Sequence, residues 1–246
     1  MDDEEVVERI RETTRVGIDA LGNNDVDQAS VRFAAVLDLC DEIDDDRTRR
    51  DEYALLAGIT EVRFPDLALS AGEEAVDLDR ALGLDNKLPQ DLIAVGNAHL
   101  NMKNTPQAEA LYRQALDILL DQEDWANAAS ANTNLGAIAA ERGDLAGAMQ
   151  IFETSLGYLA RGPFEHTEVQ TRFALLQVYE FEDVDVERAV GNARELWDRL
   201  FDELHPMQRE AGAGFLEQLC ERYLQAHPEI DDGAAWRAAA FPRVYG

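Results

Sequence analysis

The fold is decided by residues 133–156, TNLGAIAAERGDLAGAMQIFETSL. Small residues stand at Gly136 and Ala148, the large Phe152 follows four positions later, and Gly143-Asp144 interrupts the middle. Small residues let two antiparallel helices approach closely, and larger residues one turn along fill the space beside them. The stretch therefore predicts a helical hairpin with its turn at Gly143, and Asp144 as the N-cap of the second helix.

The same pattern recurs along the chain with a period near 40. Alanines equivalent to Ala148 are spaced by 39, 40, 40 and 41 residues, and they are Ala29, Ala68, Ala108, Ala148 and Ala189. Four residues after each alanine stand Phe33, Gly72, Tyr112, Phe152 and Ala193. Twelve residues before each alanine stand Gly17, Leu56, Gly96, Gly136 and Gln177. Near-constant spacing over five copies predicts a repeat protein.

Breakers divide the chain into five predicted hairpins, at about residues 5–43, 46–82, 88–121, 124–160 and 165–204. Thr105 is predicted to be an N-cap with Pro106 at the first helical position, and Pro65 suits the first turn of another second helix. Residues 205–246 are predicted to hold a capping helix, a short alanine-rich helix (GAAWRAAA) and the tail FPRVYG. Whether the tail docks on its own chain or on another is open. Strand signals are nearly absent.

These residues resemble the tetratricopeptide repeat (TPR) family over roughly residues 5–204. The usual repeat is 34 residues, so a period near 40 resembles the long-repeat type of bacterial peptide-sensing regulators and kinesin light chains. The resemblance implies an all-α fold: a right-handed superhelical TPR-like solenoid of antiparallel helix hairpins with a C-terminal capping helix. Its best-matching copies, the first, third and fourth, are carried by Val16, Gly17, Ala29, Phe33, Val95, Gly96, Ala108, Tyr112, Leu135, Gly136, Ala148 and Phe152.

The composition is strongly acidic, with a formal net charge of −28 and only two lysines, Lys87 and Lys103. Acid excess with lysine depletion resembles the cytoplasmic proteins of halophilic archaea, in which molar salt screens self-repulsion. No apolar run approaches the ~20 residues of a membrane span, and the acidic start does not resemble a secretory signal. We therefore expect a cytoplasmic protein with Cys40 and Cys220 as buried thiols.

No motif for catalysis, metal or cofactor binding is present. The chain lacks paired metal-ligand spacings, a phosphate-binding glycine loop and a nucleophile elbow. The acidic run at residues 41–46, DEIDDD, has no glycine for a calcium-loop turn, so we interpret it as a solvated surface. The four histidines are scattered, and His99 is expected to be a semi-buried packing residue. We therefore predict a non-catalytic protein without a cofactor or metal.

The candidate site is the inner groove, which the first helix of each hairpin lines in TPR-like proteins. The resemblance places Ala137, Ala140, Glu141 and Val178 among the inner positions. It also implies a binding role for Asn97 and Asn134, because an asparagine amide can donate to and accept from a peptide backbone at once. The predicted peptide- or protein-binding residues are Asn97, Leu100, Asn101, Asn134, Arg15 and Phe181.

Two alternatives stay open for these polar residues. The asparagine amides, which disfavour helix interiors, either hold a ligand or hydrogen-bond between helices. Arg11, Arg15, Arg49 and Arg50 are expected to gather near the N-terminal end, where they either meet an acidic partner or, in our preferred interpretation, neutralise the acids of residues 41–46.

The predicted function is a scaffold or adaptor that binds a protein or peptide in its groove, without direct nucleic-acid or membrane contact. One alternative is a regulatory module that senses a peptide or partner and acts with a separate DNA-binding or signalling subunit. Another is a self-assembling structural protein. The oligomeric state is expected to be monomer or weak homodimer.

Overall fold

A computed structural model describes residues 2–179 and 186–246, and in this part of the chain all regular elements are helices. The α-helices are α1 (Asp3–Gly22), α2 (Val26–Cys40), α3 (Asp46–Thr60), α4 (Pro65–Leu82), α5 (Leu88–Asn101), α6 (Thr105–Asp121), α7 (Trp125–Glu141), α8 (Leu145–Leu159), α9 (Glu165–Tyr179), α10 (Val186–Arg194), α11 (Pro206–Ala226), α12 (Gly233–Ala240) and α13 (Pro242–Tyr245). A π-helical turn (Glu195–Arg199) and a 3-10 turn (Phe201–Glu203) connect α10 to α11.

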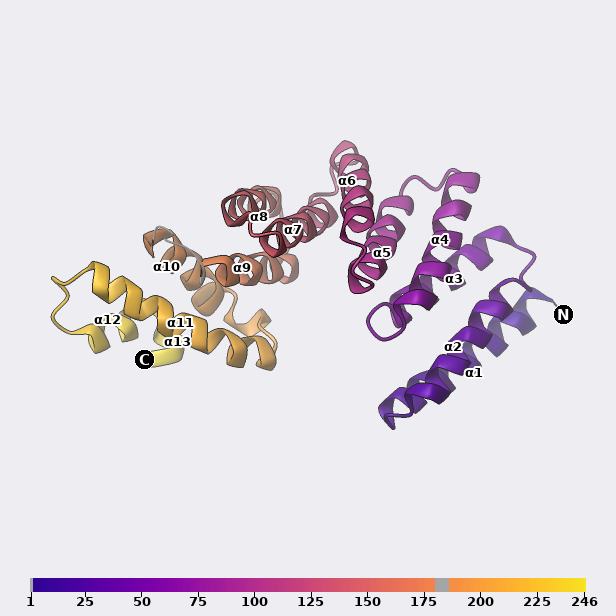
Figure 1. Cartoon of the computed structure of the whole chain (residues 1–246), viewed down its shortest axis with the longest axis horizontal. Coiled ribbons are helices and arrows are strands. Elements are labelled where there is room, and N and C mark those ends of the chain that lie inside the picture. The colour runs from indigo at the N-terminus through magenta and orange to yellow at the C-terminus, as the bar shows by residue number, and fades with distance from the viewer. Residues whose placement is uncertain (1, 180–185) are drawn as a thin grey trace. The chain divides into compact units, whose positions relative to one another are not determined.

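The helices pair as antiparallel hairpins within two compact units (Figure 1). The first unit, Met1–Gln122, holds the hairpins α1/α2, α3/α4 and α5/α6, and the second unit, Glu123–Gly246, holds α7/α8, α9/α10 and the C-terminal helices. The predicted all-α class of helical hairpins is thus confirmed, while the division near Gln122 has no counterpart in the sequence prediction.

Glycines bring the two helices of a hairpin together, as predicted. A Cβ atom built on Gly96 would lie 2.7 Å from the Tyr112 ring, and one built on Gly136 would lie 2.6 Å from the Phe152 ring. Any side chain at these positions would force the ring to move. The five periodic alanines are all buried at the same interfaces: Ala29, Ala68, Ala108, Ala148 and Ala189.

Aspartates begin many of the helices, which accounts for part of the acid excess. The Asp144 side chain accepts a hydrogen bond from the Gly147 backbone N–H at 2.9 Å, which confirms the prediction that Asp144 is the N-cap of α8. The prediction of Thr105 as a cap is wrong, because the N-cap is Asn104 and Thr105 already lies in the first turn. Pro106 is tolerated throughout a first turn and so does not fix the boundary. Among the described residues, aspartate side chains cap six helices, at Asp2, Asp25, Asp45, Asp124, Asp144 and Asp232.

A buried ionic network joins three helices of the first unit. Arg50 of α3 is 4% exposed and donates to Asp79 of α4, with Nε 2.7 Å from Oδ1, and to Asp91 of α5. Burial raises the pKa of Asp91, against the opposing effect of the Arg50 charge. One guanidinium therefore holds two carboxylates between the second and third hairpins.

The four arginines of the expected cluster pair with different acids. Arg11 and Arg15 pair with acids of their own helix, Arg49 pairs with Asp46, and Arg50 is buried in the network just described. Arg49 thus contributes to neutralising residues 41–46, but Arg50 does not. The error has a physical origin: a charged residue adjacent to another in sequence points to a different face of the helix.

The C-terminal segment folds onto the second unit. α11 begins at Pro206, as predicted, and Gly212 lets it approach Trp197, since a Cβ atom there would lie 2.5 Å from the indole ring. Phe241 is fully buried in the core of this unit, and Arg243 pairs with Asp202 at 3.0 Å. The tail therefore docks on its own chain.

Both cysteines are buried and free of a disulfide bond, as expected. Burial raises the pKa of the Cys40 thiol to about 12 and that of Cys220 to about 11, so neither forms a reactive thiolate near neutral pH. Within the described residues, no helix has both the length and the apolar character that crossing a membrane requires.

Candidate functional site

The second unit contains an open cavity with a volume of about 430 Å³. Four helices contribute to its walls: α7, α8, α9 and α11. A cavity of this size is within the range of sites that bind small molecules or peptide side chains. The lining residues are Ala137, Ala140, Glu141, Leu145, Phe152, Ala174, Gln177, Val178 and Phe215.

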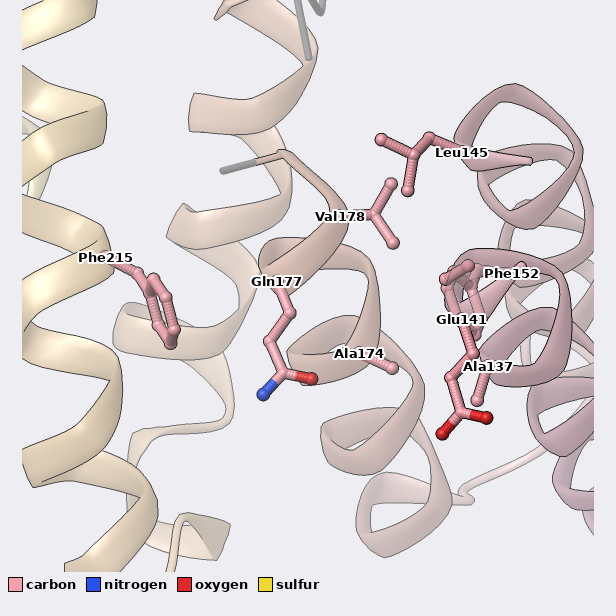
Figure 2. Close-up of a pocket in the computed structure, with 9 residues that line it drawn as sticks. Ala137, Glu141, Leu145, Phe152, Ala174, Gln177, Val178 and Phe215 are labelled. Atoms are coloured by element: carbon pink, nitrogen blue, oxygen red, sulfur yellow. The ribbon is translucent and has the colours of Figure 1, made fainter. Parts of the chain in front are cut away.

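Figure 2 shows how these side chains are arranged. α9, with Ala174, Gln177 and Val178, occupies the middle of the view. Phe215 of α11 reaches in from one side, and the α7/α8 hairpin, with Glu141 and Phe152 among its lining residues, lies on the other. The cavity is therefore lined by α9 in the middle, by α11 on one side and by the α7/α8 hairpin on the other.

Small residues create the space. Ala137 and Ala140 present only methyl groups from α7, and Ala174 does the same from α9. Phe152 cannot fill the gap, because its ring lies flush against Gly136 and is only 1% exposed. The same glycine–aromatic contact that builds the hairpin thus leaves the neighbouring volume open.

Two polar side chains stand among the apolar lining. Glu141, the last residue of α7, and Gln177 of α9 are both exposed. Neither has a hydrogen-bonding or ionic partner among the described residues. In Figure 2 the Glu141 carboxylate and the Gln177 amide both lie in the lower half of the view, with Ala174 between them. Both are available to a ligand.

The predicted asparagines of the third hairpin are engaged within the fold. Asn97 Oδ1 accepts a hydrogen bond from the Tyr112 hydroxyl at 2.6 Å, which links α5 to α6. Asn101 Nδ2 donates to the Glu61 backbone carbonyl at 2.9 Å, which links the third hairpin to the second. These contacts are of the inter-helix kind that the sequence left open as an alternative. A role for either amide in binding a ligand stays a prediction.

Three of the other predicted site residues, Leu100, Asn134 and Arg15, are not among the residues that line the cavity. Leu100 of α5 and Asn134 of α7 are half-buried. Arg15 is exposed, and its guanidinium pairs with Glu12 at 2.6 Å. Phe181 falls outside the described residues. Their binding roles are still predictions.

The described residues contain no group of three or more histidines, cysteines, aspartates or glutamates placed to hold a metal ion. The acids of residues 41–46 are instead occupied locally: Asp45 caps α3 and Asp46 pairs with Arg49. His99 is half-buried with its Nδ1 atom in the interior, in agreement with its predicted packing position.

The inner-face register predicted four of the cavity residues, although none was chosen as a binding residue. Ala137, Ala140, Glu141 and Val178 stand at inner positions of the repeat and line the cavity. The sequence prediction chose asparagines because of their amide chemistry. The cavity is instead lined by small residues beside Glu141, an acid that has no partner among the described residues. Phe215 was assigned to a capping helix, and its role as a wall depends on the docking of α11.

Comparison with solved structures identifies the fold. The chain superimposes on the Signal Transduction ATPase with Numerous Domains protein with a tetratricopeptide repeat sensor from Pyrococcus horikoshii with a TM-score of 0.68. That match has 16% identity and covers 93% of this chain and 34% of that one. The fold is that of the TPR-like helical repeat proteins. No protein-family model and no curated protein sequence matches the chain.

Two further TPR-like structures are similar over most of this chain. A Rap protein complexed with Competence and Sporulation Factor matches with a TM-score of 0.58 and 15% identity, over 96% of this chain and 69% of that one. Putative kinesin light chain TPR-like repeats from Podosopora anserina match with a TM-score of 0.56 and 16% identity, over 90% and 96%. At these identities the likeness establishes the TPR-like fold alone.

Proposed function

We propose that this protein is a non-catalytic scaffold that binds a segment of another protein, and that the cavity of the second unit receives an apolar side chain of that segment. The observation that carries the proposal is the combination of an apolar lining with two unpartnered polar groups, Glu141 and Gln177. Apolar pockets with a few convergent polar groups are the usual form of a binding site. A similar structure, the Rap conjugation gene regulator of the plasmid pLS20 in complex with the Phr* peptide, supports a peptide-like ligand.

The test is selective filling of the cavity. Ala174 lines the cavity, whereas Ala146 of α8 is exposed and does not. Ala174→Phe is expected to lose a protein that the wild type and the control Ala146→Phe both capture from a host lysate in molar KCl. Circular dichroism checks that both variants stay folded. Equal capture by the cavity variant and the wild type would overturn the proposal.

The second candidate is a regulatory module that senses its ligand and acts with a separate subunit. It is favoured by two of the similar structures, a protein with a tetratricopeptide repeat sensor and a Rap protein complexed with a factor. In this case ligand binding would change the affinity for the second subunit. Self-assembly is the third candidate, and light scattering in molar KCl tests it, because a strict monomer excludes it.

We also propose a high-salt cytoplasm as the working environment. The net charge of −28 and the near absence of lysine support it. Unscreened carboxylates repel one another, so helicity measured by circular dichroism is expected to fall on transfer from molar to low salt. Full helicity at low salt would contradict the proposal.

A further inference from the structure

The part of the cavity lining that the structure describes carries a single charge, and that charge is negative. Among these nine described lining residues, Glu141 is the only ionisable one and Gln177 the only other polar one. Glu141 is exposed, so its carboxylate meets an apolar surround only when a bound ligand covers it. Such covering lowers the local dielectric and strengthens a charge-assisted hydrogen bond from a cation of the ligand to the carboxylate.

The chain itself is short of cations to satisfy this acid. Acidic residues outnumber basic ones 50 to 22, and several arginines of the second unit have partners other than Glu141. Arg172 and Arg199 share Glu168, and Arg161 lies over the Trp125 ring at 3.8 Å. Charge complementarity therefore points to a basic group supplied by the partner.

We propose that the ligand is a protein segment carrying a bulky apolar side chain close to an arginine. This inference rests on the proposed function. The apolar side chain occupies the space over Ala174 between Phe215 and the α7/α8 hairpin, and the guanidinium donates to the Glu141 carboxylate.

Arginine suits this site better than lysine for two reasons. Its planar fork of donors reaches two acceptors at once, and the ammonium of lysine is a compact, strongly hydrated charge. High salt weakens the long-range attraction of point charges, whereas directional hydrogen bonds at contact distance persist. The hydrocarbon stem of arginine also packs on apolar surface of the kind that Phe215 presents.

Selection from a phage-displayed library of random dodecapeptides against the full chain in molar KCl provides the probe. Selected peptides are then measured by fluorescence anisotropy with arginine, lysine or the neutral isostere citrulline at the basic position. The protein variants are Glu141→Gln, with Glu73→Gln of the first unit as its matched control, and Ala174→Phe, with Ala146→Phe as its control. Glu141 and Glu73 are both exposed, so these two changes leave the fold intact.

The expected result is peptides that pair an apolar residue with an arginine. Citrulline weakens their binding about tenfold or more, as does Glu141→Gln, and the two changes together cost little more than one. Peptides that lose binding to Ala174→Phe but tolerate citrulline and Glu141→Gln would overturn the arginine inference while leaving the proposed function standing. If no peptide depends on Ala174, the proposed function itself fails.

Discussion

The third and fourth hairpins share one backbone plan and use it differently. In the third, Gly96 packs on Tyr112, and the Tyr112 hydroxyl is held by Asn97. In the fourth, Gly136 packs on Phe152, which has no hydroxyl. Forty residues on from Asn97, Leu100 and Asn101 stand Ala137, Ala140 and Glu141.

The two hairpins differ in what their polar side chains contact. The polar side chains of the third hairpin are used to join helices, as Asn101 joins the Glu61 carbonyl. At the equivalent positions the fourth hairpin has two alanines and an unpartnered acid, and there the cavity opens. Under the proposed function, the fourth hairpin binds its ligand where its side chains are small and an acid has no partner among the described residues.

The largest effect is expected from the buried ionic network that anchors the third hairpin. The fourth hairpin lacks the corresponding acid, because Ala131 stands where the third hairpin has Asp91. Arg50→Met leaves Asp79 and Asp91 buried without a countercharge, which typically costs about 3–5 kcal/mol of unfolding free energy. Urea denaturation in molar KCl measures it. A loss below about 1 kcal/mol, the range of surface ion pairs, would show that the network contributes little.

The next comparison replaces the two packing glycines. Gly96→Ala and Gly136→Ala each force a ring to move, at a cost of about 1–3 kcal/mol. Gly96→Ala is expected to cost more, because Tyr112 is tied to Asn97, whereas Phe152 borders open space. Gly157→Ala is the control, since nothing lies within 4 Å of its Cβ position. The reverse order of the two losses would contradict this account.

A smaller effect is expected from the hydrogen bond that distinguishes the third hairpin. Tyr112→Phe removes the donor to Asn97 and should lower the unfolding free energy by about 0.5–1.5 kcal/mol, as measured by chemical denaturation. Partner capture should not change. Loss of capture without loss of stability would instead support a ligand-binding role for Asn97.

The smallest effect is a pH dependence at Asp91. Because burial raises the pKa of Asp91 in the folded state, its contribution to stability is full below the ordinary aspartate pKa and is lost as pH rises through the raised value. Asp91→Asn keeps the Arg50–Asp79 pair and removes this loss. Between the ordinary aspartate pKa and about pH 7, the melting temperature should therefore fall less steeply with rising pH for the variant than for the wild type. An equal fall for both proteins would contradict the raised pKa of Asp91.

The sequence was sufficient to predict the repeat and its packing. Gly136, Ala148 and Phe152 recur at fixed spacing because each hairpin solves the same local problem of close helix approach. It was insufficient for Arg50, whose two buried partners lie 29 and 41 residues away on other helices. The cavity was missed for a related reason: it depends on α11 placing Phe215 opposite α7, which periodicity does not report.

The central claim is that the fourth hairpin binds the partner and the third does not. The direct test is the affinity of a selected peptide for two double variants, measured by fluorescence anisotropy in molar KCl. Ala137→Asn with Phe152→Tyr gives the fourth hairpin the internal hydrogen bond of the third, and Asn97→Ala with Tyr112→Phe does the reverse. The account predicts that the first variant loses binding and the second retains it. Full binding by the first variant, or loss by the second, would contradict it.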